Sequence, residues 1–155
     1  MTEFESWKAA EAAAYLKGVR QSSLDVRRLQ DEIDVQRSLL PSGMDVSRAK
    51  VRTSPQPDAL ELAAIRVIEM VEQYVTELAG YVEMQRDAHD AVRRMGDARH
   101  RAVLTLYYID GHSWETVGEK LGYSVDWCKE LRAQALPLFW DVMPRHGKTM
   151  VPRAD

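Results

Sequence analysis

The chain has 155 residues, of which 45% are hydrophobic and 29% charged, with a formal net charge of −3. This composition is typical of one soluble domain or of a compact domain with an extension, and it excludes a uniformly basic coat for nucleic acid. Residues 93–155 hold 10 Lys and Arg against 8 Asp and Glu, whereas residues 1–92 hold 11 against 16, so the C-terminal half suits a polyanionic partner better.

The first expected element is a long helix with a narrow apolar seam. Steps of three and four residues alternate along Ala12, Tyr15, Val19, Ser22, Val26, Leu29, Ile33, Gln36 and Leu40. This alternation is typical of a helix that packs lengthwise against a partner. Pro41 and Gly43 end the pattern, because proline cannot continue the helical hydrogen bonds.

Residues 41–57 are expected to connect this helix to the next one. They are too many for a minimal turn, and Pro55 and Pro57 favour extended backbone. The connector is either simply exposed or includes an ordered segment around Lys50 and Arg52 that makes contacts of its own.

A second long helix is expected from about Asp58, its N-cap, to Met95. Its seam runs through Ile68, Val71, Val75, Leu78, Val82, Gln85, His89 and Val92. Neither seam can bury itself alone, so the other helix, a second copy of the chain or the C-terminal residues must cover it. The simplest arrangement is an antiparallel, coiled-coil-like hairpin over residues 1–95, in which the polar seam positions help to fix the register.

Shorter helices are expected over residues 96–140. The expected N-caps are Asp97, Ser113 and Ser124, and the expected C-terminal stops are Gly111 and Gly122. The last helix runs through Leu136, and Pro137 is expected to kink or end it. Residues 141–155 lack periodicity and are expected to form a flexible tail. The whole chain is therefore expected to be all-α.

Two glycines, Gly118 and Gly122, interrupt the short helix that begins after Ser113. A glycine inside a helix costs about 1 kcal/mol relative to alanine. A helix-turn-helix requires both, because Gly118 sits where the two helices cross and lets their backbones approach, and Gly122 adopts the left-handed conformation of the turn. The remaining motif positions are Trp114, Val117, Leu121, Cys128 and Leu131. The spacing therefore predicts a helix-turn-helix.

The last helix is the expected recognition helix, with Cys128, Leu131, Ala135 and Leu138 facing inward. The outward candidates for DNA contact are Ser124, Val125, Asp126, Lys129, Glu130, Arg132 and Ala133, and Arg99, Arg101 and His112 are flanking candidates for phosphate contact. Arg132 or Lys129 can donate to guanine, and Asp126 or Glu130 can accept from cytosine. For each residue the alternative is a solvated surface position. Trp127 either covers the core, contacts the second helix or contacts a partner.

The stretch YIDGHSWETVGEKLGYSVDWCKELRAQAL resembles the fourth region of sigma-70 factors, and more closely the sigma-like phage regulators of the ArpU/RinA type. The resemblance extends over about residues 12–140 and includes VRTSPQPD, which is similar to a link in that family. It implies a phage protein in the bacterial cytoplasm that controls late gene transcription by binding double-stranded DNA, with RNA polymerase as a further partner. Recognition helices of the family are commonly basic, whereas this one carries Asp126 and Glu130 beside Lys129 and Arg132.

Other classes of protein are disfavoured by what the sequence contains. The single cysteine, Cys128, excludes an intramolecular disulfide and fits a reducing cytosol. The N-terminus does not read as a secretory signal, and no apolar run approaches the roughly 20 residues that span a bilayer. The four histidines are scattered, and no phosphate-binding glycine loop is present. We therefore expect no metal, no cofactor and no enzymatic activity.

Two alternatives to a transcriptional regulator remain at this point. A terminase small subunit for DNA packaging also joins a helix-turn-helix to helical oligomerisation segments. A protein-interaction module, for example one that binds RNA polymerase, would not read DNA at all. Oligomeric state distinguishes a terminase small subunit from a transcriptional regulator, because such terminase subunits form large rings whereas regulators are usually monomers or homodimers.

Overall fold

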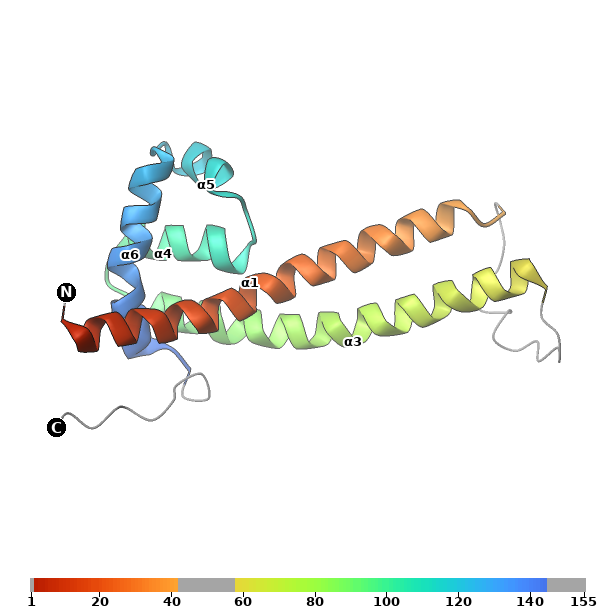
Figure 1. Ribbon diagram of the computed structural model, residues 1–155, viewed down its shortest axis with the longest axis horizontal. Helices are drawn as coiled ribbons and strands as arrows, with labels where there is room; N and C mark the ends of the chain where they lie inside the picture. Colours follow the sequence, from red (N-terminus) through yellow and green to blue (C-terminus); the bar gives the residue numbers. More distant parts are fainter. Residues whose placement is uncertain (1, 42–57, 145–155) are drawn as a thin grey trace. The chain divides into compact units, whose positions relative to one another are not determined.

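The computed structural model describes residues 2–41 and 58–144. These residues form five α-helices and one π-helical segment, with no strand among them (Figure 1). The elements are α1 (Glu3–Ser38), α3 (Ala59–Arg93), α4 (Ala98–Leu104), η1 (Thr105–Ile109), α5 (Trp114–Leu121) and α6 (Val125–Val142). The expected all-α fold is confirmed. The predictions for the connector around Lys50 and Arg52 lie outside the described residues, as does most of the expected tail.

The described residues divide into two compact units, and both long helices contribute to both. The first unit comprises residues 2–23 and 82–144, and the second comprises residues 24–41 and 58–81. The second unit buries Val26, Leu29 and Ile33 of α1 together with Ala64 and Val67 of α3. Within it, the two helical segments run in opposite directions (Figure 1). The domain boundary expected at residue 95 falls within the sequence range of the first unit.

The core of the first unit combines aliphatic side chains with Tyr108 and Phe139, which are at most 1% exposed. It contains Ala12, Leu16, Val19, Ala88, Ala91, Val92, Met95, Leu104, Tyr108, Ile109, Ala135, Leu136, Phe139 and Met143. The Tyr15 ring stacks on the Phe139 ring with 5.9 Å between centroids. The N-terminal part of α1 therefore shares one core with the short C-terminal helices.

The seam expected along α1 is confirmed at most of its apolar positions. Ala12, Val19, Val26, Leu29 and Ile33 are all buried. At two positions the buried residue is the next one along: Leu16 and Ser23 are buried, whereas Tyr15, Ser22, Gln36 and Leu40 are only half-buried. The helix ends at Ser38, just before Pro41, as the proline predicts.

The seam expected along α3 is wrong in its centre. Val75 is 58% exposed and Val82 is 43% exposed. Of the expected seam positions only Val92 is buried, and the other buried residues of α3 are Ala64, Val67, Ala88 and Ala91. Three of these residues are alanines, whose small side chains do not stand out as a bulky apolar heptad pattern in the sequence. The expected N-cap is confirmed, because the Glu61 N–H donates to Oδ1 of Asp58 at 2.8 Å.

The last helix does not end at Pro137. α6 continues to Val142, and Met143 beyond it is 3% exposed, so the prediction that the tail starts at residue 141 is wrong for residues 141–143. A proline inside a helix costs about 3 kcal/mol. Burial of Phe139 and Met143 contributes about 1.5–3 kcal/mol each, which offsets that cost.

Candidate nucleic-acid interface

The turn between α5 and α6 is built around the two glycines of the motif. Gly122 has a φ of 71° in the left-handed region, and its N–H donates to the carbonyl oxygen of Gly118. The N–H of Tyr123 donates to the same oxygen at 3.0 Å. A Cβ on Gly118 would lie 2.7 Å from the Tyr123 carbonyl oxygen. Gly118 therefore lies close to backbone, but its nearest contact is with the turn residue Tyr123 and not with the crossing helix that the sequence predicted.

The starts of α5 and α6 are fixed by the serines that the sequence indicated. Oγ of Ser113 accepts from the Thr116 N–H at 3.2 Å, and Oγ of Ser124 accepts from the Trp127 N–H at 3.1 Å. Gly111, with a φ of 75°, ends the preceding helical segment. Each cap satisfies an N–H group that has no partner within its helix, so the geometry of the turn follows from local sequence.

The inward face of α6 matches the prediction at three of its four positions. Cys128, Leu131 and Ala135 are fully buried, as is Val117 of α5. Leu138 is 51% exposed, so its assignment to the core is wrong, and the C-terminal part of α6 buries Leu136 and Phe139 instead. Leu121 and Trp114 are half-buried. Burial raises the pKa of the Cys128 thiol, which favours the unreactive protonated form.

The outward face of α6 carries charges of both signs near its N-terminus. Ser124, Asp126, Lys129 and Glu130 are exposed, and Trp127 is 38% exposed. Val125, Arg132 and Ala133 are half-buried. The exposed part of this face therefore carries one lysine and two carboxylates.

The candidates for phosphate contact in α4 already make contacts within the protein. Arg101 Nη1 donates to the Met95 carbonyl oxygen at 2.6 Å. Arg99 is exposed, and its Nη2 lies 3.1 Å from Oδ2 of Asp97. Arg101 therefore connects α4 to the residues that follow α3, whereas about half of the Arg99 side-chain surface is exposed to solvent.

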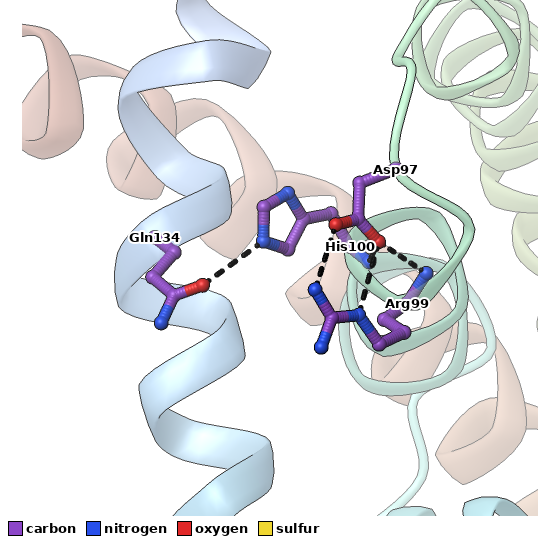
Figure 2. A network of polar contacts seen from close by, with 4 residues as sticks. All are labelled: Asp97, Arg99, His100 and Gln134. Atoms are coloured by element: carbon purple, nitrogen blue, oxygen red, sulfur yellow. Dashed lines mark hydrogen bonds and ion pairs between the residues drawn. The ribbon is translucent and has the colours of Figure 1, made fainter.

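Figure 2 shows how Asp97 and its neighbours join the start of α4 to α6. Oδ1 of Asp97 accepts from the backbone N–H groups of Arg99 (2.8 Å) and His100 (3.4 Å). The Arg99 guanidinium and these N–H groups hold the pKa of the Asp97 carboxyl well below its usual range. Nε2 of His100 lies 3.3 Å from Oε1 of Gln134 in α6, within hydrogen-bonding distance.

The sequence did not predict a stack of aromatic rings and guanidinium groups beside the turn between η1 and α5. The rings of Tyr107 and Trp114 stack with 3.9 Å between centroids and an interplanar angle of 13°. The Arg20 guanidinium carbon lies 4.1 Å from the Tyr107 centroid, and that of Arg132 lies 5.5 Å from the Trp114 centroid. His112, a further candidate, is half-buried, and its carbonyl oxygen accepts from Arg20 Nη1 at 2.9 Å.

No protein-family model, curated protein or solved structure matches this chain. Across residues 2–41 and 58–144, no helix is both long enough and apolar enough to cross a membrane. In the same residues, no three His, Cys, Asp or Glu side chains gather where they could hold a metal ion.

Proposed function

We propose that the protein is a phage-type transcriptional regulator of late genes that binds double-stranded DNA. In this proposal α4, η1, α5 and α6 form a tri-helical helix-turn-helix head, and the long helices form an antiparallel hairpin. The observation that carries the proposal is the α5–α6 turn, where a Cβ on Gly118 would lie only 2.7 Å from the Tyr123 carbonyl oxygen. Such a turn lets a second helix project its N-terminal residues into a major groove.

The exposed residues at the start of α6 are of the kinds that read base edges. Lys129 can donate to guanine, and Asp126 or Glu130 can accept from the amino group of cytosine. Carboxylates contribute no phosphate affinity, so few phosphate contacts are expected. Each contact adds about −0.9 to the slope of log affinity against log salt concentration, and we expect a slope on the order of −2 to −4. Useful affinity then requires RNA polymerase or a second copy of the chain.

The experiment is selection of bound duplexes from a random pool, followed by salt titration of the best duplex. Lys129→Ala should weaken binding and relax the preference at one base pair by about 1–3 kcal/mol. Lys17→Ala removes another exposed lysine, from α1, and should leave binding unchanged. No enrichment at low salt, with or without RNA polymerase, would contradict the proposal.

A second candidate, a protein-interaction module, is favoured by the exposed indole of Trp127 between Asp126 and Lys129. Aromatic side chains are common anchors at protein interfaces. If the chain binds RNA polymerase but no duplex, this candidate replaces the first. If sedimentation finds a large ring that binds DNA, the packaging function is the better interpretation.

A further inference from the structure

Arg20 of α1 joins the two ends of the turn that precedes α5. Its Nη1 donates to the carbonyl oxygens of Tyr107, at 2.6 Å, and His112, at 2.9 Å. The first oxygen belongs to η1, and the second belongs to the residue just before Ser113, the N-cap of α5. Hydrogen bonds from a charged donor are about twice as strong as neutral ones, so Arg20 holds this turn closed.

The carbonyl oxygens of Tyr107 and His112 can accept from Arg20 because the backbone hydrogen bonds of the turn go to other carbonyl oxygens. The Asp110 N–H donates to the Thr105 oxygen at 2.8 Å, and the His112 N–H donates to the Leu106 oxygen at 3.0 Å. Carbonyls at the end of a helix lack partners within the helix, and the guanidinium supplies one for Tyr107.

The same guanidinium begins a stack that reaches the proposed recognition helix. It lies over the ring of Tyr107, which stacks on Trp114, the first residue of α5. Arg132 of α6 lies on the Trp114 ring. Both cation-to-ring distances are within the roughly 6 Å at which such contacts stabilise. One continuous series of contacts therefore runs from α1 through η1 and α5 to α6.

We propose that Arg20 is a positioning residue for DNA binding, which orients α5 and Arg132 without touching DNA itself. This inference rests on the function proposed above. Arg20 is half-buried, and both hydrogens of its Nη1 point at backbone carbonyls. The planar guanidinium matters as well as the charge, because a lysine ammonium cannot stack on Tyr107 in the same way.

The test compares Arg20→Gln with the control variant Lys8→Gln. Lys8 also belongs to α1, but its contact is with α6 and not with the turn. Nζ of Lys8 lies 2.7 Å from Oδ1 of Asp141 and 4.9 Å from the Trp140 centroid, at the end of α6 away from the turn. Each variant removes one positive charge. Affinity for the selected duplex is measured at several salt concentrations, beside thermal melting of each protein.

Arg20→Gln should weaken binding about tenfold and leave the salt slope unchanged. Arg20→Lys should recover part of the loss, and Lys8→Gln should lower the melting temperature while affinity stays within about twofold of wild type. A slope shallower by about 0.9 for Arg20→Gln would show a direct phosphate contact and overturn the inference. Unchanged affinity, or an equal loss in Lys8→Gln, would overturn it too.

Amide hydrogen exchange separates failure of this inference from failure of the proposed function. Arg20→Gln should speed exchange at His112 and Val117, whose N–H groups lie in and just after the turn, and leave exchange at Met143 unchanged. If the wild type binds no DNA but this pattern appears, the DNA-binding proposal fails and Arg20 still positions α5. If exchange at His112 is unaltered, the positioning role itself is wrong.

Discussion

Replacing Gly118 by alanine tests the close approach at the α5–α6 turn. Alanine is favoured over glycine inside a helix by about 1 kcal/mol. Against that gain, the new Cβ would lie 2.7 Å from the Tyr123 carbonyl oxygen, so the backbone of the turn must move. Overpacking of this kind costs about 1–3 kcal/mol. Gly118→Ala should therefore range from neutral to about 2 kcal/mol destabilising by the same figures.

The matched control is Gly18→Ala, which changes a helical glycine of the same unit. A Cβ on Gly18 would meet only the Met84 Cε, at an ordinary 3.9 Å. This variant should be stabilised by up to about 1 kcal/mol. In thermal melting followed by circular dichroism, a difference of about 1 kcal/mol or more should separate the two variants by at least about 2 °C. Equal stabilisation of both would refute the close approach.

Three further predictions concern the core and its titrating groups. Val67→Asp should lower the melting temperature strongly, because Val67 is 1% exposed and the charge would be buried unpaired; Val75→Asp should be tolerated, and circular dichroism compares them. The folded-state pKa of Asp97 lies below its unfolded value of about 3.9. The ionised carboxylate of Asp97 therefore stabilises the folded protein fully at pH values above the unfolded pKa, and this contribution is lost as the pH falls through the folded pKa. Urea unfolding of Asp97→Asn should therefore depend less on pH in the acid range; an unchanged acid dependence would contradict this cause. Cys128 should react with a thiol reagent far more slowly in the folded protein than in urea, because it is buried with a raised pKa.

The features that local chemistry determines could be predicted from the sequence. Ser113 and Ser124 cap helices with their own side chains, and Gly122 adopts a backbone conformation that other residues avoid. Each of these depends on neighbours within four or five positions. The helix starts and the turn of the candidate site follow from them.

The features that tertiary packing determines could not be predicted. Val75 and Ala64 both fit a helical apolar stripe, and only the packed partner decides that Ala64 is buried and Val75 exposed. Arg20 contacts residues 87 and 92 positions away, a relation that no local spacing encodes. Pro137 stays inside α6 because the side chains after it enter the core, so packing prevails over the propensity of proline to end helices.

The most direct test of DNA binding through α6 is a titration of the isotope-labelled protein with the selected duplex, followed by amide NMR. The account predicts that chemical-shift changes concentrate in residues 124–133, with smaller changes in the turn before α5 and none around Val75 of α3. Changes centred on α3, or no changes at duplex concentrations that saturate binding in the salt titration, would contradict it.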